Sequence, residues 1–145
     1  MLSQFMVGGG VSLINIAIHA LVMTVVVQVA RGAAAKVKLH PSLFIVAVMI
    51  PTVSILMVTH TIEVIVWSWA YWIVGAAPAG ADRVYFAFVN YATLGYVDIV
   101  PLESWRLLGP ITAMNGALLF GWSTAVIFEV LRKTLARVGT SNGDR

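Results

Sequence analysis

The sequence predicts an all-α membrane protein with three transmembrane helices and one short helix that enters the membrane without crossing it. Hydrophobic residues make up 60% of the 145-residue chain and charged residues only 10%, whereas a soluble domain carries about 25% charged residues. Several uncharged runs are longer than the roughly 18 residues that a spanning helix needs. One aromatic segment between them, residues 84–90, is too short to cross a bilayer as a helix.

Residues 1–31 are expected to form an N-terminal transmembrane helix that packs at the periphery of the fold. No side chain before Arg31 is an Asp, Glu, Lys or Arg, and residues 7–29 alone are long enough for one span. The run Gly8, Gly9 and Gly10 would either fray the start of this helix or let a neighbouring helix come close. The single histidine, His19, is expected to make a packing hydrogen bond.

Residues 32–41 are predicted to be a basic cytoplasmic loop, because Lys36 and Lys38 lie there directly after Arg31. The outer helix that follows, residues 42–76, is apolar apart from His60 and Glu63. As one helix it would be about 50 Å long, more than the ~30 Å hydrocarbon core of a bilayer.

Two interpretations of residues 42–76 are open. Either one long tilted helix bends at Pro51, or two short spans meet near Thr59 and His60. The positive-inside rule favours one long helix, because the basic loop and the basic segment 132–137 should lie on the same, cytoplasmic side.

The rest of the chain divides into four segments. Asp82 is placed to cap a short helix over residues 83–92, and an uncharged turn begins at residue 93. An inner helix is expected over residues 105–137. Residues 138–145 are polar and are expected to be a disordered tail.

The turn carries the sequence Thr93, Leu94, Gly95, Tyr96, Val97 and Asp98. It resembles the filter of the potassium-channel superfamily, whose pattern is Thr-(Val/Ile/Leu)-Gly-(Tyr/Phe)-Gly-Asp, in five of six positions. The resemblance implies a pore module over residues 42–137 that assembles as a homotetramer. It also implies that backbone carbonyls of the filter replace the hydration shell of a permeant K⁺, or of Na⁺.

Val97 stands where the family pattern has its second glycine. A β-branched residue at positive φ is an outlier that costs of order 1–3 kcal/mol. Our hypothesis is that the Val97 peptide is rotated, so that the outermost ion site is lost or widened and selectivity for potassium over sodium is altered.

The resemblance continues along residues 105–109 and 115–125 of the inner helix. Gly116 falls at the family's hinge glycine, although close helix packing explains it equally well. Four other residues of the inner helix recur at helical spacing and would face the central cavity of the pore: Ala117, Phe120, Thr124 and Phe128. Phe128 would either form a hydrophobic constriction near the cytoplasmic end or pack against the outer helix.

His60 and Glu63 are three residues apart, so their side chains can touch on one face of the outer helix. Ionisable groups at membrane depth are costly and are usually partnered. A pH sensor or a metal site is one interpretation. We favour a structural hydrogen-bonded pair that faces the inner helix or the pore helix, which is the short helix over residues 83–92.

These observations predict a tetrameric channel that conducts monovalent cations passively, in the plasma (inner) membrane, with the N-terminus outside and the C-terminus cytoplasmic. One alternative is a subunit of a potassium uptake transporter; another is a non-conducting sensor or regulatory subunit that kept the pore fold. No catalytic constellation, bound cofactor or soluble ligand domain is expected. The net charge of +3 is attributed to cytoplasmic loops and not to nucleic acid binding.

Overall fold

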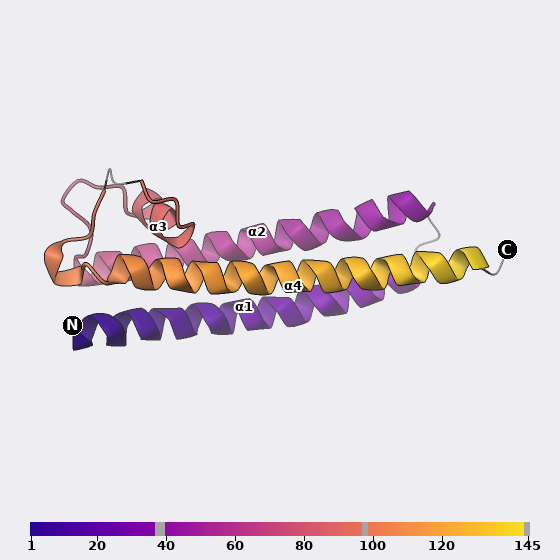
Figure 1. The fold of residues 1–145 in the computed structure, drawn as a ribbon, viewed down its shortest axis with the longest axis horizontal. Helices are drawn as coiled ribbons and strands as arrows, with labels where there is room; N and C mark the ends of the chain where they lie inside the picture. Colours follow the sequence, from indigo (N-terminus) through magenta and orange to yellow (C-terminus); the bar gives the residue numbers. More distant parts are fainter. Residues whose placement is uncertain (37–39, 97–98, 144–145) are drawn as a thin grey trace.

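The computed structural model describes residues 1–36, 40–96 and 99–143, and all its regular elements over these residues are helices (Figure 1). In chain order they are α1 (Leu2–Lys36), α2 (Pro41–Val74), α3 (Arg83–Tyr91), the 3-10 helix η1 (Glu103–Trp105) and α4 (Leu108–Gly143). Three segments are long and apolar enough to cross a membrane: Leu2–Val29, Ser42–Val74 and Glu103–Gly139. The predicted all-α membrane class with three spanning helices is confirmed.

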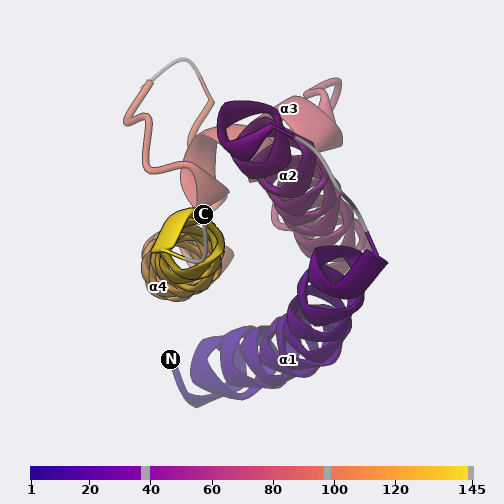
Figure 2. The same cartoon turned by 90° about the vertical axis from the view of Figure 1, so that its right-hand side faces the viewer.

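The three long helices run side by side, and each packs against the other two (Figure 1). The N-terminus lies at the same end of the bundle as α3, whereas the end of α1, the start of α2 and the end of α4 lie at the opposite end (Figure 1). Seen along the bundle, α1 and α2 form an arc with α4 on its concave side (Figure 2). The segment between α3 and α4 extends on the side away from α1.

Helix α1 is longer than the predicted span and does not fray at its three glycines. A Cβ atom at Gly8 would lie 2.8 Å from Cγ2 of Ile111, so the missing side chain lets α1 come close to α4. Near the same end, the buried Gln4 accepts a hydrogen bond of 2.9 Å from the backbone N–H of Leu107 through Oε1. Helix α1 therefore contributes side chains to contacts inside the fold, and its peripheral position relative to the pore module stays a prediction.

Helix α2 is one continuous helix of 34 residues with Pro51 inside it. Proline at position 51 offers no N–H to the preceding turn, and the next hydroxyl, Thr52 Oγ1, donates to the carbonyl of Val48 at 2.8 Å. The helix ends at Gly75, which has φ 64°, and the N–H of Ala76 donates to the carbonyl of Tyr71 at 2.9 Å. This is the Schellman arrangement, which favours glycine at the left-handed position.

Helix α3 begins at its predicted cap. Oδ1 of Asp82 accepts from the N–H of Val84 at 2.9 Å and of Tyr85 at 3.2 Å. The ring of Phe86 lies 4.8 Å from that of Tyr71, near the end of α2. The last residue, Tyr91, reaches Glu63, which lies 11 positions before the end of α2.

The chain then returns to the end of the bundle from which α3 started. The backbone N–H of Leu102 donates to the carbonyl of Ala76, directly after α2, at 3.0 Å. Helix α3 and the following loop therefore enter and leave the bundle at the same end. This is the re-entrant course expected from the sequence.

Buried aromatic and aliphatic side chains join α2, α3 and α4 at this end. Trp67, Tyr71, Phe86 and Leu108 are fully buried in this cluster. The cluster also contains Val64, Ala70, Ala76, Ala87, Tyr91 and Ile111. Burial of such large apolar groups fixes the position of the short α3, which has too few residues to be stable alone.

Helix α4 differs from the predicted inner helix at both ends. It starts at Leu108 rather than at residue 105, because Pro110 fits only the first turn of a helix. It extends to Gly143, so the disordered tail predicted from residue 138 is wrong up to that residue. Val138 packs against the cluster formed by Phe44 and Val48 of α2 with Val130 of α4, which continues the apolar contact between the two helices.

Gly116 lies where α4 comes very close to the end of α3. A Cβ atom at this position would lie 2.1 Å from the backbone carbonyl oxygen of Tyr91. The backbone at the end of α3 cannot move away without a large energetic cost, so only glycine allows this contact. The contact supplies a packing reason for Gly116 that needs no hinge.

We predict that Gly116→Ala destabilises the protein by about 1–3 kcal/mol, the usual cost of overpacking. Thermal unfolding of the purified protein in detergent, followed by circular dichroism, measures the effect as a lower midpoint. Gly121→Ala is the matched control, since a Cβ atom there meets nothing within 4 Å. Equal midpoints for the two variants would contradict the packing role of Gly116.

Candidate functional site

The segment that follows α3 is uncharged and uncovered within one subunit. Residues 93–96 are all exposed, with Leu94 at 51% and Tyr96 at 58% of their full surface. Two hydrogen bonds close the end of α3 before this segment, from the N–H of Thr93 to the carbonyl of Asn90 and from the N–H of Leu94 to that of Val89. The segment therefore leaves α3 at a defined point.

The backbone of this segment changes handedness from residue to residue. Thr93 has φ 56° and Gly95 has φ 70°, whereas Leu94 between them has no positive φ. A left-handed conformation costs a non-glycine residue about 1–2 kcal/mol, so Thr93 is held there by its surroundings. The sign of φ therefore alternates over residues 93–95.

The last two positions of the predicted filter, Val97 and Asp98, lie outside the described residues. The rotation of the Val97 peptide stays a hypothesis. The four described positions, Thr93, Leu94, Gly95 and Tyr96, form the loop that the sequence placed between the short helix and the inner helix.

The predicted cavity-facing side of α4 is uncovered in the subunit. Ala117, Phe120, Thr124 and Phe128 are all exposed, whereas Leu119 and Ser123 on the other side of the helix are buried. Phe128 is 66% exposed, so it does not pack into the contact with the outer helix, as one interpretation of the sequence required. Phe120 is less exposed because its ring lies 4.6 Å from that of His60 and 5.4 Å from that of Tyr91.

A second feature, which we call the Glu63 cluster, lies inside the bundle. It consists of His19 from α1, His60 and Glu63 from α2, Tyr91 from α3 and Ser123 from α4. The carboxylate of Glu63 is at its centre and is fully buried. The carboxylate thus joins α1, α2 and α3 directly, and Ser123 adds α4 through the two histidines.

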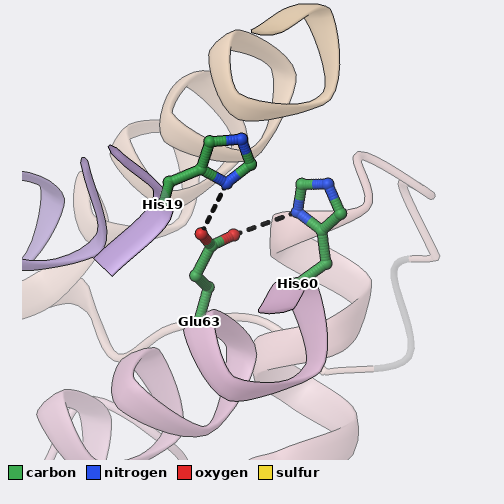
Figure 3. Close-up of side chains that lie close together, drawn as sticks. All are labelled: His19, His60 and Glu63. Carbon is green, nitrogen blue, oxygen red and sulfur yellow. Dashed lines mark hydrogen bonds and ion pairs between the residues drawn. The ribbon is translucent and has the colours of Figure 1, made fainter. Parts of the chain in front are cut away.

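Three donors converge on that carboxylate. Nδ1 of His19 lies 2.8 Å from Oε1, and Nδ1 of His60 lies 3.0 Å from Oε2 (Figure 3). The hydroxyl of Tyr91 donates to Oε2. As expected, His60 and Glu63 form a hydrogen-bonded pair that faces the pore helix and the inner helix, and His19 makes a packing hydrogen bond.

The two imidazoles share a further partner on α4. Oγ of Ser123 lies 2.9 Å from Nε2 of His60 and 3.4 Å from Nε2 of His19. Each ring therefore directs Nδ1 to Glu63 and Nε2 to Ser123. A neutral ring that donates from Nδ1 has an acceptor at Nε2, so the hydroxyl of Ser123 can donate its proton to one of the two rings.

Buried amides extend the polar contacts one turn further. Nδ2 of Asn15 lies 3.2 Å from the backbone carbonyl oxygen of Glu63 and 3.2 Å from Oδ1 of Asn115. Nε1 of Trp67 also donates to Oδ1 of Asn115, at 3.1 Å. These contacts fix α1 and α4 against α2 beside the Glu63 cluster.

Sequence reasoning found His60 and Glu63 but missed Asn15, Tyr91 and Ser123 as members or neighbours of the cluster. Asn15 and His19 are four residues apart in the part of α1 before Arg31, which has no charged side chain, so they lie on one face. Two polar residues on one face of an otherwise apolar helix indicate a buried contact. That signal could have found Asn15, whereas nothing in the sequence aligned Tyr91 or Ser123 with Glu63.

Comparison with known proteins gives one match. A family model described as "Ion channel" matches residues 59–133, which is just over half of the chain. The matched range begins directly before His60 and includes Glu63, α3, the loop and most of α4. Neither the curated proteins nor the solved structures contain a match.

Proposed function

We propose, from the premise that this chain belongs to the ion channel family, that four copies of it form a channel through which monovalent cations cross a membrane passively. The match identifies a pore domain of the two-transmembrane potassium-channel type. Helix α1 precedes the matched range and adds a third membrane-spanning helix.

The observation that carries the proposal is the course of the chain between α2 and α4. Tyr91 contacts Glu63, 11 residues before the end of α2, which corresponds to a depth of about 16 Å along the helix. Residues 93–96 therefore begin well inside the span as non-helical backbone. Such backbone is tolerated at membrane depth only where protein encloses it or where it lines a water-filled cavity.

One subunit alone does not provide that enclosure, since residues 93–96 are exposed in it. A closed ring of identical subunits would surround the loop with protein on one side and an axial water path on the other. Each chain supplies one loop, and the family resemblance assigns four loops to each pore; cyclic symmetry closes such an assembly. The uncovered face of α4 with Ala117, Phe120, Thr124 and Phe128 would line the same axis.

Conduction would proceed through oxygen atoms of the main chain. Left-handed Thr93 and Gly95 support an arrangement in which successive carbonyls point to one side. Rings of such carbonyls bind a dehydrated cation at several weak sites, so that ions displace one another. The permeant ion would be K⁺ or Na⁺, with Asp98 attracting cations to the mouth and Val97 altering the outermost site.

The gate and the orientation follow from the same arrangement. Phe128 lies nearer than the loop to the end where α1 connects to α2, and four copies would form a hydrophobic constriction there. Basic residues near the end of α1 and near the end of α4 favour a cytoplasmic location for this end of the bundle. The N-terminus would then lie outside and the C-terminus inside, in the plasma (inner) membrane.

Purified protein in planar lipid bilayers is expected to give discrete single-channel currents carried by cations. Gly95→Val is the matched variant, because a β-branched residue at φ 70° must change the loop. We expect it to change or abolish the unitary current while the oligomer stays intact. Silence from intact wild-type tetramers would contradict the proposal and support a non-conducting subunit, and ion flux without unitary steps would support a transporter.

Val97→Gly is expected to shift the reversal potential under bi-ionic potassium and sodium toward potassium. A roughly tenfold change in the permeability ratio corresponds to ~1.4 kcal/mol of discrimination. Val100→Gly is the control, since it makes the same change at an exposed valine outside the filter. No difference between wild type and Val97→Gly would refute the hypothesis for Val97.

A further inference from the structure

The Glu63 cluster contains three metal-binding side chains whose donor atoms face one another. One ligand atom each from His19, His60 and Glu63 lies within 4.8 Å of both others. Figure 3 shows both imidazoles turned toward the carboxylate, with His19 coming from a different helix than the other two. His19 and Glu63 are fully buried, and the side chain of His60 is 15% exposed.

We propose that His19, His60 and Glu63 bind a divalent transition metal ion of the zinc type. Two imidazole nitrogens and one carboxylate oxygen are a ligand set that suits Zn²⁺, with a solvent molecule in the fourth position. Tetrahedral ligand atoms at bond lengths of about 2.0–2.2 Å lie about 3.4 Å apart. The present Nδ1–Oε separations of 2.8 and 3.0 Å would need to open by a few tenths of an ångström, which side-chain rotation allows.

Ser123 is positioned to orient both ligands. Metal binding through Nδ1 requires each neutral imidazole to carry its proton on Nε2, and Oγ of Ser123 faces both Nε2 atoms. A histidine ligand that donates its other N–H to a fixed acceptor has its tautomer and ring orientation set in advance. The Tyr91 hydroxyl orients the carboxylate of Glu63 by donating a hydrogen bond to Oε2.

Charge also favours a cation at this position. A buried carboxylate at membrane depth needs a positive partner. In the part of the chain that the structure describes, the ion-pair partners of Glu63 are two histidines, which carry charge only when protonated. A divalent ion supplies the charge without protonation of either ring.

An entry path lies beside Phe120. The ring of Phe120 is in contact with that of His60, and Phe120 is 38% exposed on the uncovered face of α4. If that face lines the cavity, as proposed above, the metal ion reaches the site from the cavity by displacing this ring. Bound metal would hold α1 to α2 beside Tyr91, the last residue before the loop. Only this route depends on the proposed function; the binding site does not.

The test uses the full chain, purified in detergent, stripped with a chelator and titrated with Co²⁺ as a spectroscopic probe and then with Zn²⁺. We expect one Co²⁺ per chain with the intense visible absorption of a four-coordinate ion, and displacement by Zn²⁺. His19→Gln and His60→Gln should each weaken binding more than about 100-fold, and Ser123→Ala about ten- to a hundredfold.

His40→Gln is the matched control. His40 is the one histidine of the chain outside the cluster and is exposed before the first turn of α2, so the substitution should leave binding unchanged. Size-exclusion profiles and helical content identify variants that fail to fold, and Ser123→Ala keeps all three ligands in place.

The proposal is overturned if the wild-type chain gives no four-coordinate Co²⁺ spectrum. It is also overturned if folded His19→Gln and His60→Gln bind as tightly as wild type. Because the readout is metal binding and not current, a protein that binds Zn²⁺ but stays silent in bilayers would refute the channel and keep the site. A protein that conducts but binds no metal would refute the metal site and keep the channel.

Discussion

The rest of the structure depends on one buried carboxylate. Glu63 lies on a membrane-spanning helix, has no exposed surface, and accepts hydrogen bonds from His19, His60 and Tyr91. An unpaired charge at this depth would cost several kcal/mol, so the three donors must stay close. Because they come from α1, α2 and α3, this requirement fixes the positions of three helices at one level.

The position of the loop follows from that requirement together with one steric constraint. Tyr91 is the last residue of α3, and its side chain is held by Glu63 while its carbonyl meets Gly116 of α4. Polar attraction from α2 and close contact with α4 therefore determine where α3 ends. The loop begins two residues later, at the left-handed Thr93. The depth at which main-chain oxygens would meet an ion is thus set by groups outside the loop.

The sequence predicted the features that arise from local chemistry. The length of the apolar segments predicted three spanning helices, and Asp82 predicted the start of α3. The spacing of His60 and Glu63 predicted that their side chains touch. It did not predict the end of α4, where Val138 packs against a cluster that includes Phe44 of α2, a contact that only the tertiary fold reveals. The convergence of Tyr91 and Ser123 on the Glu63 cluster likewise joins residues 28 to 104 positions apart in the chain, which periodicity along one helix cannot show. The resemblance of residues 93–98 to a known filter supplied the proposed function, which periodicity could not.

The most direct measurement of this account is a double-mutant cycle between Glu63 and Tyr91. The free energy of unfolding in detergent would be measured for wild type, Glu63→Gln, Tyr91→Phe and the double variant. We expect a coupling free energy of about 1–3 kcal/mol, because Tyr91→Phe removes the buried hydrogen bond and Glu63→Gln removes the charge that strengthens it. Additive effects, with a coupling below about 0.5 kcal/mol, would show that the carboxylate does not hold α3 in place and would contradict the account.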